Sequence, residues 1–423
     1  MLGYKSAAMR YSALSLVRQA FQGHAGWPPL WRSPEPKPRY DVVVVGGGGH
    51  GLATAYYLAK NHGIRDVAVI EKGWLGGGNT GRNTTVIRSN YYFPASAEVY
   101  DLALRLYENL GIELDFNVMV SQRGMIFLAH APLQLDNYRR IVNAMLVNGI
   151  DALLLGRDEV LRRAPLLNAR ADARFPIVGG LCQPRAGIAR HDAVAWGYAR
   201  AADRQGVDIV QRCEVTGFGI AGGRVRAVHT SRGTIEAGAV ALAVAGHSSV
   251  LAAKAGFRLP ITSYALQAMV SEPVKPILDT VVISPATGVY VSQSDKGELV
   301  FGGGLDLYPS YAQRGNMPVV EHVVAGLTEM FPAFAQLRLM RKWAGVVDVV
   351  HDSSPILGPT PVAGLTINCG WGTGGFKAIP AGGWLTAHIV TTGAHHPLSA
   401  PFDLGRFQTG ALVDEAAAAG IAH

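Results

Sequence analysis

A glycine-rich run holds the first residues whose spacing indicates a chemistry. Gly46, Gly48 and Gly51 follow the pattern G-x-G-x-x-G, with Gly49 and His50 inside it. The first glycine of this pattern permits a tight turn, the second lets a pyrophosphate approach backbone N–H groups, and the third lets a helix pack closely on a strand. The run therefore predicts a dinucleotide-binding turn if a strand precedes it and a helix follows it.

A carboxylate and a polar loop follow the glycines. Glu71 stands about 20 residues on, where an acidic residue can bind ribose hydroxyls and disfavours a 2′-phosphate. This favours FAD or NAD over NADP. Residues 76–85 then supply N–H groups and hydroxyls of the kind that a pyrophosphate and a ribityl chain need, although an ordinary surface loop has the same composition. The candidate cofactor-binding residues of this loop are Gly78, Asn79, Thr84 and Thr85.

The elements around these residues have the required order. Residues 40–45 form a short apolar, β-branched run that ends at glycine, which is typical of a buried parallel strand. Residues 51–62 follow a helical pattern, and Gly63 is the expected residue after the last helical turn. Residues 67–70 are the second expected strand. The segment 40–71 is thus predicted to be a βαβ unit.

The rest of the chain predicts a second kind of architecture. Helices are expected at 96–111 and at 193–205, the latter started by Asp192 as N-cap and stopped by Gly206. After residue 258, strands at 267–270, 288–292 and 298–302 read as antiparallel, with a turn at 295–297. The fold class predicted is α/β, a Rossmann-like dinucleotide-binding domain with an inserted α+β domain that contains an antiparallel sheet.

The composition of the 423 residues excludes several classes of protein. Hydrophobic residues make up 49% and charged ones 16%, which is globular and not disordered. The net charge of +7 is scattered and not clustered, so nucleic-acid binding is not expected. No apolar stretch reaches the roughly 20 residues that span a bilayer. Cys182, Cys213 and Cys369 lie far apart, which argues against disulfides and a metal site and for a reducing compartment.

Residues 1–38 are basic and end in a proline-rich segment, 33–38. A transit peptide is one interpretation, but a clear apolar region and a small-residue cleavage site are lacking. An arm that packs on a partner or on a domain surface is the other. Met9 also offers an alternative start to Met1.

Three segments, 46–88, 189–198 and 369–377, resemble the β subunit of heterotetrameric sarcosine oxidase, a member of the D-amino-acid-oxidase/monomeric-sarcosine-oxidase superfamily. The resemblance covers nearly the whole chain, from about Tyr11 to His423, and includes the arm with Trp27 and Trp31, which counts against a transit peptide. It implies an FAD-binding domain of the glutathione-reductase type. The expected pieces are 39–95, 170–257 and 340–423 for FAD and 96–169 and 258–339 for the substrate domain.

The resemblance also implies roles for single residues. His191 would carry FMN covalently, because a neutral imidazole before a helix N-terminus can act as the nucleophile. Arg88 and Lys377 would hold a substrate carboxylate, and Lys377 would also lie at the FAD. Monomeric relatives attach FAD to a cysteine, but residues 345–355 contain none, so FAD is expected to be non-covalent. Further FAD contacts are implied for Val215, Gly246, Gly372 and Gly375.

The function implied by the resemblance is oxidative demethylation of sarcosine to glycine. The imine product would give formaldehyde or pass its carbon to tetrahydrofolate in a partner subunit, and electrons would pass from FAD to FMN and then to dioxygen, giving hydrogen peroxide. The partners implied are α, γ and δ-type subunits, and the location is cytoplasmic. Two alternatives stay open: oxidation of dimethylglycine, proline or glycine, or a flavin-binding scaffold subunit without catalysis.

Overall fold

A computed structural model describes residues 13–25 and 29–413. Its first sheet has β1 at the centre, parallel to both β2 and β12. Outward from β2 lies β9, and outward from β12 lie β11 and β10, with β19 and β18 joined to β12 as a branch. The strands are β1 (Arg39–Val45), β2 (Val67–Ile70), β9 (Asp208–Val210), β10 (Val215–Ala221), β11 (Arg224–Thr230), β12 (Gly233–Leu242), β18 (Ile356–Pro359) and β19 (Leu365–Cys369).

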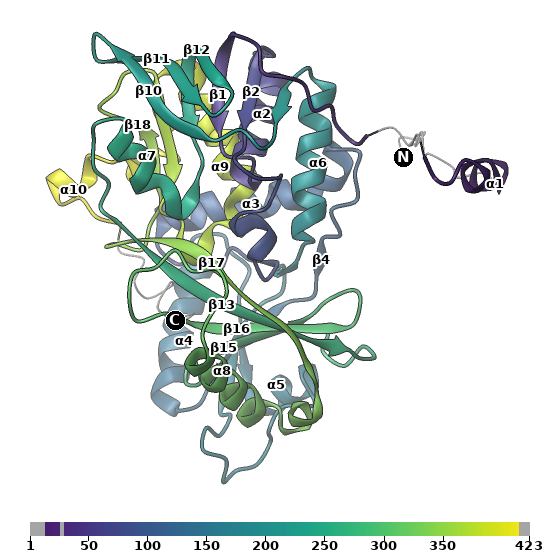
Figure 1. The fold of residues 1–423 in the computed structure, drawn as a ribbon. Helices are drawn as coiled ribbons and strands as arrows, with labels where there is room; N and C mark the ends of the chain where they lie inside the picture. Colours follow the sequence, from purple (N-terminus) through teal and green to yellow (C-terminus); the bar gives the residue numbers. More distant parts are fainter. Residues whose placement is uncertain (1–12, 26–28, 414–423) are drawn as a thin grey trace, which may run out of the picture.

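Helices cover one face of this sheet, in the upper part of Figure 1. Val42 and Val44 of β1 pack in one buried cluster with apolar side chains of these helices, whereas Val43 and Val45 pack on the other face with residues of β10, β11 and β12. This alternation follows from the two-residue repeat of a strand. The helices are α2 (Gly49–His62), α3 (Pro94–Glu113), α6 (His191–Arg204) and α9 (Ile379–Thr392).

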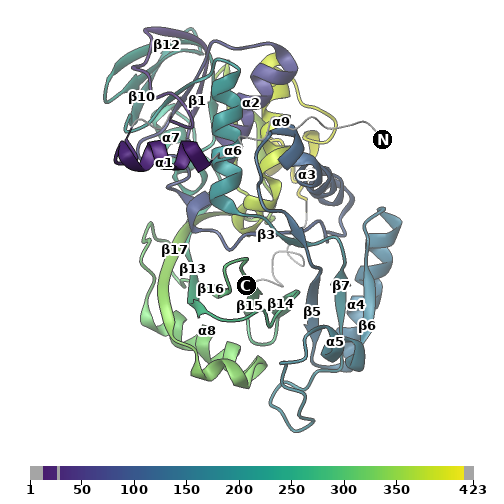
Figure 2. The ribbon, with the colours of Figure 1, turned by 90° about the vertical axis from the view of Figure 1, so that its right-hand side faces the viewer.

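A second sheet of mixed strands forms the lower part of the molecule (Figures 1 and 2). Its order is β17, β13, β16, β15, β14, β5, β7, β6, and the long pairing of β13 with β17 is antiparallel. The strands are β5 (Met125–Ala129), β6 (Leu153–Gly156), β7 (Gly179–Gln183), β13 (Ile261–Pro273), β14 (Val281–Ser284), β15 (Val289–Gln293), β16 (Glu298–Leu305) and β17 (Leu339–Val350). Helices α4 (Pro132–Val147), α5 (Arg157–Arg163) and α8 (Met317–Met330) accompany this sheet.

A small sheet links the two parts. It consists of β3 (Val86–Ile87), β8 (Gly187–Ile188) and β4 (Ser121–Gln122), with β8 paired to both others. Arg88 follows β3 directly, and His191 follows β8 by three residues. This sheet therefore fixes the backbone positions from which the side chains of Arg88 and His191 extend.

The structure confirms the βαβ unit and the antiparallel strands. Helix α2 ends at Gly63, which adopts the left-handed conformation with φ of 69°, and Gly297 closes its turn with φ of 98°. The N-cap predicted at Asp192 is wrong. Helix α6 begins at His191 with Arg190 as N-cap, because the Asp192 carboxylate binds the Arg190 guanidinium and the adjacent Ala193 N–H instead.

Two strands within the pieces predicted for the FAD domain belong to the second sheet. The pieces 170–257 and 340–423 include β7 and β17, but both strands pair within the second sheet. The apolar runs of buried strands look alike in sequence, whichever sheet they join. Periodicity therefore could not assign β7 and β17 to one of the two sheets. We propose the same discontinuous division with β7 and β17 moved to the second domain.

The N-terminal arm has a helix that stands away from the main body in Figure 1. This helix, α1 (Ala13–Phe21), has no buried residue. The following stretch is held by ion pairs from Arg32 to Asp203 at 2.7 Å and from Lys37 to Asp66 at 2.9 Å. Met1, Met9, Tyr11 and Trp27 lie outside the described residues. No helix in the described ranges is long and apolar enough to cross a membrane.

Candidate active site

A cavity of about 540 Å³ lies between the two sheets, a size typical of cofactor and ligand sites. One end is formed by Glu71 after β2 and by Val215 at the start of β10. The other end is formed by side chains of the second sheet, among them Tyr290 and Val347. The predicted residues on its wall are Gly46, Gly48, Gly49, His50, Glu71, Gly78, Asn79, Thr84, Val215, Gly372, Gly375 and Lys377.

The glycine turn is shaped by close backbone contacts. Gly46 has φ of 109°, and a Cβ atom there would collide with the carbonyl oxygen of Ala243 at the end of β12. A Cβ atom on Gly51 would collide with the carbonyl oxygen of Gly46, so this glycine does not line the cavity but lets α2 start directly over β1. The first N–H groups of α2 lack partners within the helix and carry its positive dipole end. The turn can therefore cradle a pyrophosphate.

Glu71 holds the turn and faces the cavity. Its carboxylate accepts the N–H groups of Gly47 and Gly73, both at 2.8 Å. Each carboxylate oxygen has a second lone pair, so ribose hydroxyls can still bind. The predicted role in ribose binding is thus compatible with the structure.

The polar loop after Glu71 is tied down by its own side chains. The amide of Asn79 donates to the carbonyl of Val346 at 2.6 Å and accepts its N–H at 2.8 Å, which joins the loop to β17. Thr84 lines the cavity, but Thr85 does not. Thr85 has φ of 69°, and its carbonyl accepts the N–H of Ala189 at 2.9 Å, so its role is to hold the segment before His191.

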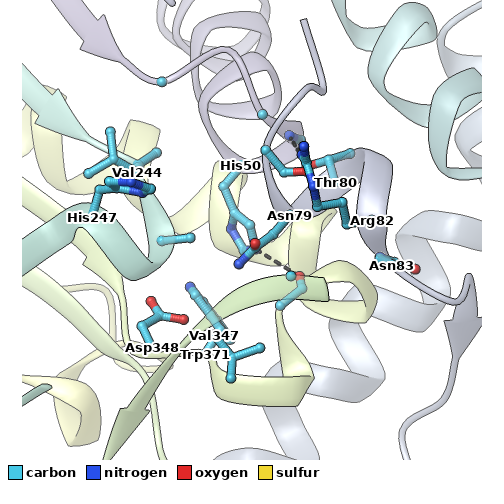
Figure 3. Close-up of a pocket in the computed structure, with 18 of the residues that line it drawn as sticks. His50, Asn79, Thr80, Arg82, Asn83, Val244, His247, Val347, Asp348 and Trp371 are labelled. Atoms are coloured by element: carbon cyan, nitrogen blue, oxygen red, sulfur yellow. Dashed lines mark hydrogen bonds between the residues drawn. The ribbon is translucent and has the colours of Figure 1, made fainter. Parts of the chain in front are cut away.

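His50 lies at the centre of the cavity wall (Figure 3). Its Nε2 atom is 2.8 Å from the carbonyl oxygen of Gly375, and its ring stacks on Trp371 with centroids 5.1 Å apart. Burial lowers the pKa of His50 to about 4, so the imidazole is neutral. Nε2 therefore donates to Gly375, which leaves Nδ1 as a buried acceptor without a partner among the described residues.

Two buried cations lie close to one another at the far end. Lys377, on the 3₁₀ helix η5 (Phe376–Ala378), lines the cavity and donates to the carbonyl of Thr373 at 3.1 Å. Arg88 is 4% exposed, binds Asn90 and lies over the ring of Tyr91 at 4.8 Å. Burial and then the charge of Arg88 lower the pKa of Lys377 well below its ordinary value. No ion pair to either cation occurs among the residues that the structure describes.

Arg88, Gly246 and His191 do not line this cavity, and neither do Gly51 and Thr85. Gly246 belongs to the 3₁₀ helix η2 (Ala245–His247) and faces Val346, whereas its neighbours Ala245 and His247 line the wall. His191 begins α6, with Nδ1 buried and without a partner in the described part of the chain. Burial lowers the pKa of His191; the Asp192 charge opposes this shift, and the Arg190 charge adds a smaller lowering.

Asp348 of β17 lines the cavity and was not among the predicted site residues. Its carboxylate is 2% exposed and accepts the N–H of Gly370 at 2.5 Å. Burial raises the pKa of Asp348 to about 6, and the backbone N–H groups of Gly370, Gly372 and Trp371 oppose this rise. A single acidic residue within the apolar run 344–350 is the sequence feature that could have indicated Asp348 as a site residue. Tyr290, His247 and Gln313 also line the cavity and were not predicted.

Comparison with known proteins identifies the family. The pattern of FAD dependent oxidoreductases matches residues 41–389. The chain is 54% identical over 414 residues to the sarcosine oxidase subunit beta of Rhodobacter capsulatus, covering 98% of this chain and 100% of the relative. The chain belongs to the FAD-dependent oxidoreductases, among the sarcosine oxidase β subunits. Identity to the subunit beta of an Arthrobacter species is 55% over 93% of this chain and 97% of that relative.

Solved structures share this fold. L-proline dehydrogenase from P. horikoshii has a TM-score of 0.84 and 28% sequence identity, over 89% of this chain and 100% of that one. Glycine oxidase from Geobacillus kaustophilus has a TM-score of 0.77 over 88% of this chain and 99% of that one, at 24% identity. The predicted fold class is therefore confirmed.

FAD fits the residues present. The glycine turn offers the backbone N–H groups at the start of α2 to a pyrophosphate. Glu71 and Val215 offer a carboxylate and a backbone edge for an adenosine half. The flavin half would then extend toward Trp371, Asp348 and Lys377.

Proposed function

We propose that this chain binds sarcosine by its carboxylate and oxidises the methyl carbon on nitrogen, giving glycine. The observation that carries the proposal is the pair Arg88 and Lys377. Two buried cations, close enough for one to lower the pKa of the other, are unfavourable without an anion. A carboxylate at this position would neutralise them and form charge-assisted hydrogen bonds.

The chain's own residues would orient the amine and not transform it. Lys377 and Arg88 would fix the carboxylate, and Tyr290 and Val347 would close the apolar side of the cavity against water. FAD, when bound without a covalent link, supplies the electron acceptor next to the amine carbon. The imine product would hydrolyse to glycine and formaldehyde, or a partner subunit would transfer its carbon to tetrahydrofolate.

The proposal includes a second flavin, FMN, covalently bound to His191, from which dioxygen takes the electrons to give hydrogen peroxide. A neutral imidazole with a free nitrogen supports this role. Arg190 lies 3.6 Å from Asp295, which lines a pocket of about 580 Å³ together with Arg123 and Lys296. Arg123 and Lys296 could bind a phosphate group there, beside the carboxylates of Asp279 and Asp295 that line the same pocket.

Mass spectrometry tests this attachment directly. A tryptic peptide with His191 from active enzyme should carry a flavin-sized mass increment, and His191→Ala should lose it while FAD stays bound. An unmodified peptide from fully active enzyme would exclude the covalent flavin.

The assembly proposed is a hetero-oligomer with α, γ and δ-type subunits in the cytoplasm. The relatives at 54% and 55% identity are named as subunits, and they cover nearly all of this chain. The exposed face of α1 offers a contact for such a partner. The three cysteines are free and buried, as a reducing compartment allows.

Anaerobic reduction tests the reaction. Sarcosine should bleach the FAD absorbance of the purified protein, and the rate should saturate with sarcosine concentration. Similarity to a proline dehydrogenase keeps proline as a second candidate, with dimethylglycine and glycine beside it. Faster bleaching by one of these amines would reassign the substrate, and no bleaching by any of them would favour a scaffold subunit.

A further inference from the structure

Asp348 is a buried acid that has no part in the proposed binding of the substrate carboxylate. It lies on β17, opposite Ser263 of β13, and its carboxylate is directed to the segment after β19. No ion pair to Asp348 occurs in the described ranges. Its partners are the N–H groups of Gly370, Trp371 and Gly372, all from the backbone. The carboxylate is therefore a buried charge compensated by dipoles alone.

The position of Asp348 follows from the direction of the cavity. Glu71 and Val215 form the adenosine end, and the glycine turn forms the middle. Asp348, Trp371 and Lys377 line the wall on the other side of that turn. In Figure 3, Asp348 and Trp371 lie across the cavity from Thr80 and Arg82, with His50 between them. A dinucleotide whose adenosine half occupies the first end therefore places its flavin half beside Asp348.

We propose that Asp348 is a positioning residue that acts by its negative charge and keeps the bound FAD difficult to reduce, so that electrons move on readily to the next acceptor. The inference rests on the proposed function, because that function requires the FAD to pass its electrons onward.

The physical basis is a like-charge interaction. Reduction of a flavin takes up two electrons and, near neutral pH, one proton, and so adds one negative charge to the ring system. In a cavity closed to water, a carboxylate nearby opposes that charge more strongly than it would in solvent. The carboxylate also fixes the segment 370–372, which leads to Lys377. Only the first effect requires the ionised form of Asp348, because a protonated carboxyl group can still accept backbone N–H groups.

The stability of the protein argues for a functional charge. Burial raises the pKa of Asp348, which means that ionised Asp348 destabilises the folded state above that pKa. The backbone hydrogen bonds reduce this cost but do not remove it. A residue that served only to hold the loop would do so without that cost as an asparagine or a serine. Perturbed acids of this kind gather at sites of chemistry.

Three titratable groups around Asp348 are uncharged near neutral pH. They are Cys369 of β19, His50 of α2 and His247 of η2, each from a different element. Burial raises the pKa of Cys369 and lowers those of His50 and His247. Lys377 is the nearby cation on the cavity wall, and Lys72 and Glu71 lie at the adenosine end. A pH-dependent change between pH 5 and 8 that disappears in Asp348→Asn therefore belongs to Asp348.

The test is the midpoint potential of bound FAD, measured by dithionite titration against a redox dye at pH 5 and pH 8. Wild type and Asp348→Asn are compared, each also in a His191→Ala background that lacks the proposed covalent flavin. At pH 8 the potential of Asp348→Asn should be more positive than that of wild type. At pH 5, where Asp348 is protonated, the two should converge.

Two controls separate charge from loop geometry. Asn368 accepts the Nε1–H of Trp371 at 2.6 Å, so Asn368→Ser loosens the same segment without changing a charge. Any change in potential that it causes should be equal at both pH values. Asp348→Ser replaces the asparagine variant if that variant does not fold.

Equal potentials for wild type and Asp348→Asn at pH 8 would overturn the proposal. A difference of the same size at pH 5 and pH 8 would overturn it too, because it would reflect geometry alone. Dithionite needs no amine, so a failure of sarcosine to bleach the FAD would contradict the proposed function and leave this test intact.

Discussion

The substitution Lys377→Met removes one of the two cations proposed to hold the substrate carboxylate while keeping the length of the side chain. Of the three ammonium protons, one is used by the carbonyl of Thr373, so two can bind a ligand. One hydrogen bond to a charged group is worth about 1.5–3 kcal/mol. The KM for sarcosine should therefore rise roughly 10- to 100-fold, since 1.4 kcal/mol is a factor of ten. Arg88 remains, so this is a lower bound on what the pair contributes.

The assay is steady-state oxidation of sarcosine, with oxygen uptake as the signal and FAD content measured in every preparation. Lys60→Met is the matched control, because Lys60 lies on the surface of α2 in an ion pair with Glu113. A second readout follows from burial. Burial and the nearby Arg88 charge make the ammonium form of Lys377 costly to the folded state. The methionine variant should therefore melt at a higher temperature than wild type in the absence of substrate. An unchanged KM in a variant that retains FAD would refute the anchor.

Three further substitutions test the fold and the site. Gly46→Ala should abolish FAD binding because its Cβ atom would meet Ala243. Gly63→Ala, at φ of 69° with no atom within 4 Å, should lower the stability of the fold by only about 1 kcal/mol. FAD content after gel filtration distinguishes the two variants, and FAD retention by Gly46→Ala would contradict the role of the turn. Asp352→Asn breaks the buried pair with Arg406, with contacts of 2.8 and 3.0 Å, and should cost about 3–5 kcal/mol in denaturant unfolding; a loss below 1 kcal/mol would refute this. Burial raises the pKa of Asp348 from 3.8 to about 6, so wild type loses stability as the pH rises through 6. The free energy of unfolding of Asp348→Asn should therefore gain about 3 kcal/mol relative to wild type between pH 4 and pH 8. A gain independent of pH in melting curves would exclude Asp348 as the titrating group.

The local parts of the site could be predicted because short-range rules fix them. The G-x-G-x-x-G spacing, the strand before it and Glu71 after the second strand determine one another within a single βαβ unit. Gly63 ends α2 in the left-handed conformation that its position required. Here the sequence predicts the geometry because the strands, the helix and Glu71 of the unit lie within about 30 residues of one another.

The remaining parts depend on contacts between distant segments. Gly246 was assigned to FAD by the family resemblance, but the packing of η2 on β17 turns it toward Val346. Ala245 and His247 line the cavity instead. Tyr290 reaches the wall through the pairing of β15 with β16, which periodicity does not specify. Asp192 has the residue type of an N-cap, but in the structure its carboxylate binds the guanidinium of Arg190.

The charges at the flavin end of the cavity act in opposite directions. Arg88 and Lys377 favour an anion, whether a substrate carboxylate or a reduced flavin, while Asp348 on β17 opposes one. Cations alone would bind the substrate and would also stabilise electrons on the FAD, which slows their departure. An acid held by backbone dipoles offsets the second effect without pairing with the cations, because no ion pair joins it to them among the described residues. Under the two proposals, separate placement of the two signs of charge would allow tight binding of a substrate carboxylate beside a flavin that gives up its electrons.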